Sequence, residues 1–476
     1  MINWWLLLVA VIVFLLVVGG IFLLVRLYSS PEDRNHAWLP KCVVVCGLSL
    51  ACFAVLLLPY DVANKKSVLV MESIGGGLNT VLMWKILLWL IVVFTLIIVP
   101  FAIFYYESWD PDKPGISAQF SSALGYTAII FLTFVGLSVI LWVTVGYSDL
   151  PFKNYISNHQ IGDIAQSHEL NVRTVQELSF LSFRVSVFVY IVGLFSTIGW
   201  LGFAFFGGIG LVAVPFELIN EWKNRSRPIP VELYLKAKED VLARSRYLQD
   251  IGRKIDKSLQ TSAGNTSVDK KVKLFRNEVM ELEKRYENLE TSYRKSGGSP
   301  IRAFVIMLIG IFSSCLSLLW ALHMILYNMS GIDSFLNTCF IELDRRFALL
   351  GTFAYSICCF FLLWCVVQGI FCIGLNFLVI SIHPMKVGDT LMNSFLFNTM
   401  IVLFCSITVT QFAALSFREY AANTAVDNIF ATYVLRLRGI GYVMQYMQYF
   451  LLLNMLITPF WMILRSGKKD KRFEIE

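Results

Sequence analysis

The sequence predicts an all-α fold: a polytopic membrane protein with about nine transmembrane helices and one helical hairpin outside the membrane. Of its 476 residues, 57% are hydrophobic and 15% are charged, whereas soluble domains average about 25% charged residues. The apolar residues form long runs, and residues 347–380 contain no Lys, Arg, Asp or Glu. A run of that length and composition is typical of a membrane span. One long polar stretch, residues 217–300, interrupts the series.

Residues 1–216 are predicted to form an N-terminal transmembrane bundle of five spans. No Lys or Arg precedes the first apolar run and no small-residue cleavage pattern follows Arg26. We therefore expect a retained anchor, not a removable signal peptide. Pro100 predicts a kink in the third span, and the glycines of the fifth span favour close helix packing in lipid. Residues 147–184 are polar and are expected to form a loop outside the membrane. The five runs are residues 4–25, 42–58, 81–105, 123–146 and 185–215.

Residues 217–300 are predicted to form a cytosolic coiled-coil insert. Apolar residues in its second half alternate at spacings of three and four, which is the heptad pattern of helices packed along a seam. The segment TSAGNTS, residues 261–267, is rich in turn formers and separates the two halves. The sequence therefore predicts an antiparallel two-helix hairpin whose residues 228–298 offer a surface for protein partners. The seam residues of the second half are Val272, Phe275, Val279, Leu282, Tyr286, Leu289 and Tyr293.

Residues 301–464 are predicted to form a C-terminal transmembrane bundle of four spans, followed by a basic cytosolic tail at residues 465–476. The sixth and ninth spans are expected at about residues 303–327 and 441–464, and the eighth ends near Ser416. Between the last two spans, five apolar residues share one face of a helix, which predicts an amphipathic helix on the membrane surface or on the other loops. They are Val426, Phe430, Tyr433, Val434 and Leu437.

The block HPMKVGDTLMNSFLFN, residues 383–398, separates the seventh and eighth spans. It is too polar to lie in lipid unaided. Two interpretations remain open: a simple turn with an interfacial Lys386, or a structured re-entry beside a polar pathway. Asn398 lies about one helical turn inside the eighth span, where it cannot easily reach the interface. We therefore expect Asn398 to need a protein partner, and Asn376 and Gln368 in the seventh span are candidates.

Polar residues within the spans or at their ends are the candidate functional residues. They either line a polar pathway or hold helices together through hydrogen bonds, and the sequence leaves both roles open. LPYDVAN (58–64) and VPFELIN (214–220) share a pattern, which is either an inverted repeat of the kind found in transporters or a coincidence of span ends. Asn328-Met329-Ser330 fits a glycosylation acceptor next to the membrane. The candidate residues are Asp61, Glu217, Gln368, Asn376, His383, Asn393, Asn398 and Gln411.

The sequence offers no catalytic or metal-binding motif. It contains no HExxH, GxSxG or Walker A pattern and no Cys/His cluster, and its 5 His are scattered. We therefore expect no enzyme activity, no metal and no cofactor. The net charge of +7 follows the loops, so no nucleic-acid partner is expected. Most of the 10 Cys lie inside apolar runs, where they act as small apolar residues, so no disulfide framework is expected.

Four segments together resemble a known family. The block at residues 383–398, with LLGT (349–352), LLPYDVAN (57–64) and LRGI (437–440), is similar to the lipocalin-interacting membrane receptor (LIMR) family, the limb-development membrane proteins. The resemblance extends over nearly the whole chain and is closest to the plant and protist members, near the branch of the lysosomal cobalamin transport proteins. No established set of ligand-binding residues comes with it.

The resemblance implies an integral membrane protein that transports a cargo, escorts a transporter or serves as a receptor. In the first case the implied cargo is cobalamin and the implied location is a lysosomal or endosomal membrane, with the plasma membrane as the alternative. The other hypotheses are an endocytic or signalling receptor, and a scaffold that acts through its coiled-coil insert. The expected partners are the lipid bilayer, a small-molecule cargo, proteins bound through residues 228–298, and a second copy of the chain.

The distribution of basic residues predicts the orientation. Loops on the side of the 26–41 connection, the insert and the tail carry 29 of the 40 Lys and Arg. Counting only the ends of the long insert leaves about 19 against 11 on the other side, and basic loops face the cytosol. We expect the N-terminus to be lumenal or extracellular and the C-terminus cytosolic. Protease protection in sealed vesicles should find tags after Lys295 and Glu476 accessible and a tag before Trp4 protected. A protected insert with an accessible N-terminus would reverse this orientation.

Overall fold

The computed structural model contains, among the residues it describes, nine helices long and apolar enough to cross a membrane. This confirms the predicted all-α polytopic fold with nine spans. The spans are Leu8–Tyr28, Trp38–Lys65, Thr80–Glu107, Gln119–Val145, Val187–Lys223, Pro300–Met329, Leu350–Cys372, Met392–Ser416 and Ile440–Leu464. The structure describes residues 4–471 except 31–32, 34–36, 71–78, 109–115, 157–174, 226–227, 262–265, 295–298, 348, 374–375, 378–379 and 382–389.

The N-terminal half contains two breaks of the α-helical pattern. The segment η1, Phe94–Ile98, is π-helical and directly precedes the turn that holds Pro100, which lacks a backbone N–H. The segment η3, Phe203–Gly207, interrupts the glycine-rich fifth span in the same way. Short π-helical segments within α-helices often mark functional sites. The helices are α1 (Trp4–Tyr28), α2 (Trp38–Val70), α3 (Thr80–Val93), α4 (Val99–Glu107), α5 (Ile116–Val145), α6 (Val187–Gly202) and α7 (Gly208–Lys223).

The C-terminal half contains two further π-helical segments, η4 (Met324–Met329) and η5 (Asn428–Val434). Residues 417–440 were predicted to form an amphipathic helix on the membrane or on other loops. In the structure they hold the short helix α14 (Ala425–Asp427) and η5, and Val426, Phe430 and Val434 are buried in protein. The other elements are α10 (Pro300–His323), α11 (Phe335–Arg346), α12 (Leu350–Ile373), β3 (Asn376–Phe377), β4 (Ile380–Ser381), α13 (Met392–Ser416) and α15 (Ile440–Lys471).

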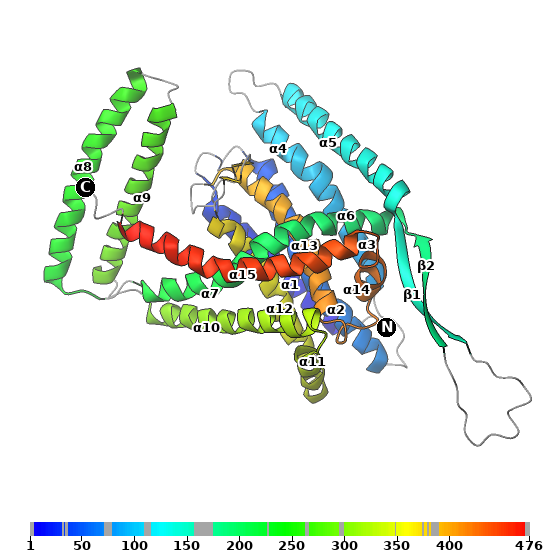
Figure 1. Ribbon diagram of the computed structural model, residues 1–476. Coiled ribbons are helices and arrows are strands. Elements are labelled where there is room, and N and C mark those ends of the chain that lie inside the picture. The colour runs from blue at the N-terminus through cyan, green and yellow to red at the C-terminus, as the bar shows by residue number, and fades with distance from the viewer. Residues whose placement is uncertain are drawn as a thin grey trace, which may run out of the picture. The chain divides into compact units, whose positions relative to one another are not determined.

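A β-hairpin replaces part of the polar loop expected at residues 147–184. Strands β1 (Tyr147–Ile156) and β2 (Val175–Arg184) pair antiparallel, with Tyr147 opposite Arg184. Figure 1 shows the hairpin extending from the end of α5. Its base is joined to the segment before α15, because Arg438 N donates to Tyr147 O at 3.1 Å and Asp149 N donates to Arg436 O at 3.3 Å. The sequence analysis missed this pairing.

The chain divides into two compact units, residues 1–214 with 316–476, and Pro215–Cys315. The second contains the paired helices α8 (Val231–Thr261) and α9 (Thr266–Arg294). The Tyr234 and Tyr293 rings stack at 4.1 Å, and Arg244 Nη2 lies 3.3 Å from Glu278 Oε2. Helix α8 ends at Thr261 and α9 begins at Thr266, and most of the turn predicted at residues 261–267 lies outside the described residues. The heptad packing of a coiled coil, the cytosolic location and the division at residues 217, 301 and 465 stay predictions.

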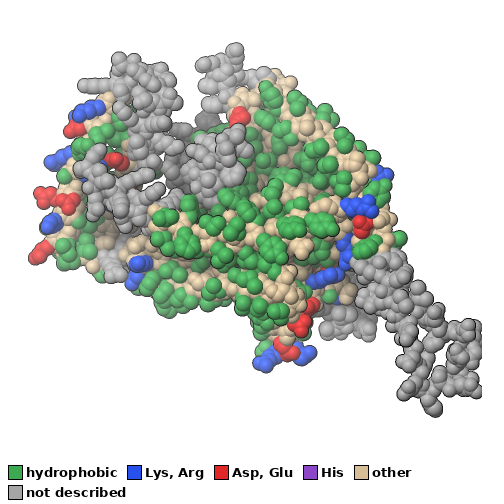
Figure 2. Space-filling view, viewed as in Figure 1, with side chains coloured by type: hydrophobic (Ala, Val, Ile, Leu, Met, Phe, Trp, Pro, Cys, Tyr) green, Lys and Arg blue, Asp and Glu red, His purple; other side chains and the backbone are tan. Residues whose placement is uncertain are grey.

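Helix α13 forms the core of the membrane unit (Figure 1). Within its most apolar stretch 78% of residues are buried, against 6% for α1 and for α5. It packs against α2, α4, α6 and α12. The helices at the edge instead present apolar side chains outward, and in Figure 2 hydrophobic side chains cover most of the visible face of the spans. An apolar exterior of this kind suits a lipid environment.

The contacts at the ends of the helices agree with alternating spans. Where α1 ends and α13 begins, Ser30 N donates to Thr390 O at 3.1 Å. Asn393 Nδ2, in the first turn of α13, donates to Glu107 Oε1 at the end of α4 at 2.7 Å. We call this side of the membrane unit face I. Face II is the other side, where α2 ends and where α12 begins.

Glycines bring the fifth span and α12 into backbone contact. A Cβ at Gly210 of α7 would overlap the carbonyl oxygen of Cys365 in α12, and a Cβ at Gly369 of α12 would overlap that of Phe206 in η3. Close approach through small residues is a common way to pack helices in lipid. The predicted role of the glycines in the fifth span is therefore seen at Gly210.

Gly210→Ala should lower stability, because its methyl group has no space and the two backbones must separate. Overpacking of this kind costs about 1–3 kcal/mol. The matched control is Gly19→Ala in α1, where no atom lies within 4 Å of the new Cβ. Thermal melts in detergent should show a lower midpoint for Gly210→Ala and a near-wild-type one for Gly19→Ala. Equal midpoints for the two variants would contradict the packing described here.

Candidate functional site

A belt of hydrogen bonds surrounds Gln411 in the middle of the bundle. Gln411 is fully buried. Its Oε1 accepts from the hydroxyl of Ser196 and, at 3.1 Å, from Trp200 Nε1, while its Nε2 donates to Met444 Sδ at 2.8 Å. One turn earlier, Thr408 Oγ1 donates to Ser196 O at 2.9 Å. The belt joins α13 to α6 and α15, so in this structure Gln411 holds helices together.

A buried carboxylate caps α13 at face I. Asp33 comes from the connection between α1 and α2 and is 6% exposed. Its Oδ2 accepts from Met392 N at 2.9 Å, in the first turn of α13, and its Oδ1 accepts from Tyr106 OH at 2.8 Å. The first N–H groups of a helix lack partners within it and carry partial positive charge. Asp33 therefore satisfies α13 with a group 359 residues away in the sequence.

Asp61 has a corresponding role at face II, where its carboxylate accepts a hydrogen bond from the first turn of a different helix, α14. Asp61 lies in α2 and is 2% exposed. Its Oδ2 accepts from Val426 N and from Trp84 Nε1, both at 3.0 Å. Val426 belongs to the first turn of α14. This candidate residue thus fixes the start of α14 against α2 and α3.

Asp344 caps α12 on the same face. Its Oδ1 accepts from Gly351 N at 2.7 Å and Thr352 N at 3.3 Å, and its Oδ2 accepts from Tyr420 OH at 2.6 Å. A Cβ at Gly351 would overlap the carbonyl oxygen of Phe340, so glycine is needed there. Burial, followed by the hydrogen bond to Asp344, raises the pKa of Tyr420, and its hydroxyl therefore stays protonated and donates.

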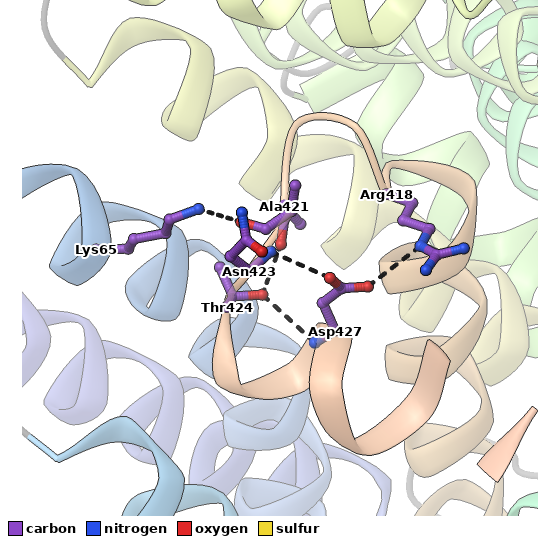
Figure 3. Close-up of polar contacts among 7 residues, drawn as sticks. Lys65, Arg418, Ala421, Asn423, Thr424 and Asp427 are labelled. Atoms are coloured by element: carbon purple, nitrogen blue, oxygen red, sulfur yellow. Dashed lines mark hydrogen bonds and ion pairs between the residues drawn. The ribbon is translucent and has the colours of Figure 1, made fainter. Parts of the chain in front are cut away.

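The connection from α13 to α14 closes over face II (Figure 3). Lys65 of α2 donates to the carbonyl of Ala422. Asp427 accepts from Asn423 N at 3.1 Å and pairs with Arg418 at 3.5 Å. Asn423 has φ = 58°, a left-handed conformation that Asn tolerates better than most residues. These contacts hold the connection in one conformation above the bundle.

A large basin lies beside this connection. Its volume is about 1060 Å³, and it extends from the base of the β-hairpin to Met444, which is 1% exposed. Three arginines line it. Arg418 pairs with Asp427 and Arg438 with Asp149, and the described residues show no ion pair for Arg436. Other lining residues are Phe180, Ser182, Tyr327, Asn328, Leu415, Leu435, Leu437, Gly439, Gly441, Tyr442, Gln445 and Gln448.

The pair between Asp149 and Arg438 links the hairpin to the rim of the basin. Arg438 Nε lies 2.9 Å from Asp149 Oδ2, and Ser182 also donates to this carboxylate. The hydrogen bonds from Arg438 and Ser182 hold the pKa of Asp149 below its usual value of 3.8. The carboxylate therefore stays ionised in any compartment less acidic than that.

Two apolar cavities border the lipid-facing helices. The larger, about 720 Å³, lies among α1, α2, α3 and α12 and is lined by Phe14, Phe53, Tyr60, Phe353 and other apolar side chains. The smaller, about 200 Å³, lies among α1, α2, α12 and α13. Asn398 lines the smaller cavity. It is 5% exposed, and within the described part of the chain neither its Nδ2 nor its Oδ1 has a hydrogen-bond partner.

The structure does not gather the remaining candidate residues into one site. Glu217 and Gln368 are half-buried on different helices. Asn393 is at face I, bonded to Glu107. Asn328 Nδ2 donates to Ser416 Oγ at 2.9 Å. Asn376 begins β3, and nothing is described of its side chain. His383 and the rest of residues 383–389, the first part of the block at residues 383–398, lie outside the described residues.

The residues that sequence analysis missed are the distant caps and the basin rim. Asp33, Asp344 and Asp149 looked like ordinary loop acids, because Met392, Tyr420 and Arg438, to which they bond, are far away in the sequence. Arg436 and Arg438, next to the positive φ of Gly439, gave the clearest signal: two arginines and a glycine directly before a span. Among the described residues, no group of three or more His, Cys, Asp or Glu is placed to hold a metal ion.

Comparison with known proteins identifies the family. The family model described as LMBR1-like membrane protein matches residues 3–299. A LIMR family protein of Dictyostelium discoideum is 30% identical, with 100% of each chain covered. The chain belongs to the LIMR family. Another LIMR family protein, from Arabidopsis thaliana, is 34% identical over 93% of this chain and 92% of its own. No solved structure matches the chain.

Membership of the LIMR family supports a multi-pass membrane protein. The similarity to family members also extends beyond the residues that the family model matches. The family model ends at residue 299, but the relatives also align with the C-terminal spans. A LIMR family protein of Oryza sativa covers 98% of this chain at 31% identity. Helix α13 and the basin therefore lie in the part of the chain that full-length LIMR proteins share.

The ion pair between Asp149 and Arg438 at the basin rim predicts how the stability of this LIMR protein depends on pH. Because the pKa of Asp149 is lowered on folding, its stabilising effect is full above about pH 3.8 and is lost as the pH falls through the folded value. The difference in melting midpoint between wild type and Asp149→Asn should stay constant from pH 7 to pH 5 and shrink below about pH 4. Arg345→Gln, which removes an exposed pair with Glu342, is the control. A difference that disappears between pH 7 and pH 5 would contradict the assignment.

Proposed function

We propose that this LIMR protein transports an amphipathic small molecule across a lysosomal or endosomal membrane, or escorts a transporter of one. Cobalamin is the cargo that the family resemblance implies. The observation that supports this most is the basin of about 1060 Å³, which reaches from face II to Met444 directly above Gln411. Its volume lies just above the range for small-molecule sites, about 300–1000 Å³.

The chemistry of the basin suits a cargo with both apolar and anionic parts. Phe180, Leu435 and Tyr442 offer apolar and aromatic surface, and Gln445 and Gln448 offer amides. Arg436 supplies a cation that no carboxylate among the described residues neutralises. A guanidinium binds phosphate or carboxylate groups with two parallel hydrogen bonds.

The floor of the basin suggests how a path would open. Met444 has an unbranched side chain that can adopt several rotamers. It lines the basin, and its sulfur accepts from Gln411 Nε2 at 2.8 Å. Rotation of Met444 would expose an amide that can exchange one partner for another. The belt hydrogen bonds are complete in this structure, so the conformation corresponds to a closed path.

The exposed apolar surface of α8 favours a second function, in which the insert binds protein partners. Val231, Leu233, Leu235 and Leu242 are each about half exposed there, and exposed apolar side chains of this kind often bind protein partners. This supports the scaffold role, or recruitment by a receptor, through residues 228–298. An escort would use the same surface.

Uptake of cobalamin into proteoliposomes that contain the purified protein tests the transport proposal. Gln448→Trp should narrow the basin and reduce uptake severalfold, because the bulky ring takes up space that the cargo would occupy. Tyr446→Trp is the matched control, since Tyr446 is on the same helix, is 66% exposed and does not line the basin.

Equal uptake by both variants would contradict the role of the basin. No uptake by wild type, together with co-purification of another transport protein, would favour the escort. Neither uptake nor a transport partner would overturn the proposal.

A further inference from the structure

The smaller cavity holds one polar group in an apolar lining. Its volume is about 200 Å³, and its walls include Leu24, Leu48, Phe360 and Phe395. Asn398 faces these residues with both amide atoms unpaired in the described part of the chain, although 95% of its surface is buried. A buried amide without partners is costly. We propose that this cavity binds the hydroxyl end of a neutral membrane lipid, with Asn398 as its hydrogen-bond partner.

A water molecule is a poor match for this cavity. Buried waters usually make about three hydrogen bonds. Asn398 supplies some of these, and the hydroxyl of Thr399 is already donated to Phe395 O at 2.8 Å. The other polar groups of the described lining are the thiol of Cys52, a weak partner, and the indole N–H of Trp364, which can only donate. One water would also leave most of the apolar wall without contacts, whereas a ligand with an apolar body packs against it.

The lining also selects the polar group of the ligand. None of the described residues that line the cavity is charged, so a phosphate or carboxylate would be buried without compensation. The Asn398 side chain both donates and accepts. A hydroxyl also does both, so one hydroxyl can pair with both amide atoms, whereas an ester or ketone can only accept.

The position of the cavity points to a ligand from the bilayer. It is bounded by α1, of whose most apolar stretch only 6% is buried, and by Trp364, which is 38% exposed. Asn398 is six residues into α13, or about 9 Å along its axis. That depth is inside the hydrocarbon core of about 30 Å but close to its edge. Sterols and diacylglycerols both carry a single hydroxyl near this depth.

This site is separate from the basin. The basin opens at face II and ends at Met444, while Asn398 lies near the face I end of α13. The lipid proposal therefore does not depend on the cargo or on transport. Loss of cobalamin uptake would leave it unchanged.

Photolabelling of the full-length protein in nanodiscs tests the proposal. Two diazirine probes are used in separate arms, one a sterol and one a diacylglycerol, and the crosslinked residues are mapped by mass spectrometry. At least one probe should label residues 360–371 or 395–402. Labelling should fall at least severalfold in Asn398→Leu and persist in Asn393→Leu, which changes an amide on the same helix outside the cavity. The arm that labels identifies the lipid class.

Competition in the wild-type protein provides a second measurement that does not depend on the variant folding. The unlabelled lipid should compete, and its methyl ether, which cannot donate, should compete severalfold less. In lipid-free detergent, Asn398→Leu should melt no lower than wild type, because it removes an unpaired amide. No labelling by either probe, equal labelling of Asn398→Leu and wild type, or equal competition by the ether would overturn the proposal.

Discussion

The burial of α13 is the constraint on which the rest of the membrane unit depends. A span that faces lipid needs only apolar side chains, but α13 is enclosed by α2, α4, α6 and α12. Met392 N, in its first turn, is buried away from water, and polar side chains deep in the helix, such as Gln411, cannot extend to the interface. Both problems are solved by other segments: Asp33 accepts from the first turn, and Ser196, Trp200 and Met444 surround Gln411.

The same solution recurs at face II. Asp61 and Asp344 accept from the first turns of α14 and α12, and each also binds an aromatic donor, Trp84 or Tyr420. Each carboxylate therefore connects a helix start to a second element. These contacts hold Tyr420 and Val426 on the connection from α13 to α14, which also carries Arg418 of the basin lining. Asn398 is the exception, because neither of its amide atoms has a hydrogen-bond partner among the described residues. For this reason we assign a ligand site to the cavity that it lines.

The spans could be predicted from the sequence because membrane insertion depends on the composition of one contiguous segment. Residues 347–380 are uncharged, and α12 lies within them. The caps could not be predicted, because Asp33 and Met392 are joined only by the three-dimensional fold. The β1–β2 pairing was missed since Asp149 and Ser182 are polar, as loop residues are. Gln411 was a candidate from its position in a span, but no pattern could distinguish a pathway from a bond between helices.

The stability of Asp33→Ala tests most directly whether distant carboxylates hold α13 in place. Glu107→Ala is the comparison, because Glu107 is also an acid at face I but binds the exposed Asn393. Removing Asp33 takes away the carboxylate to which Met392 N and Tyr106 OH donate. The buried Met392 N then loses its acceptor, at a cost of about 1–3 kcal/mol. Thermal melts of the purified protein should show a clearly lower midpoint for Asp33→Ala and a near-wild-type one for Glu107→Ala. Equal midpoints for Asp33→Ala and wild type would contradict the central role assigned to this cap.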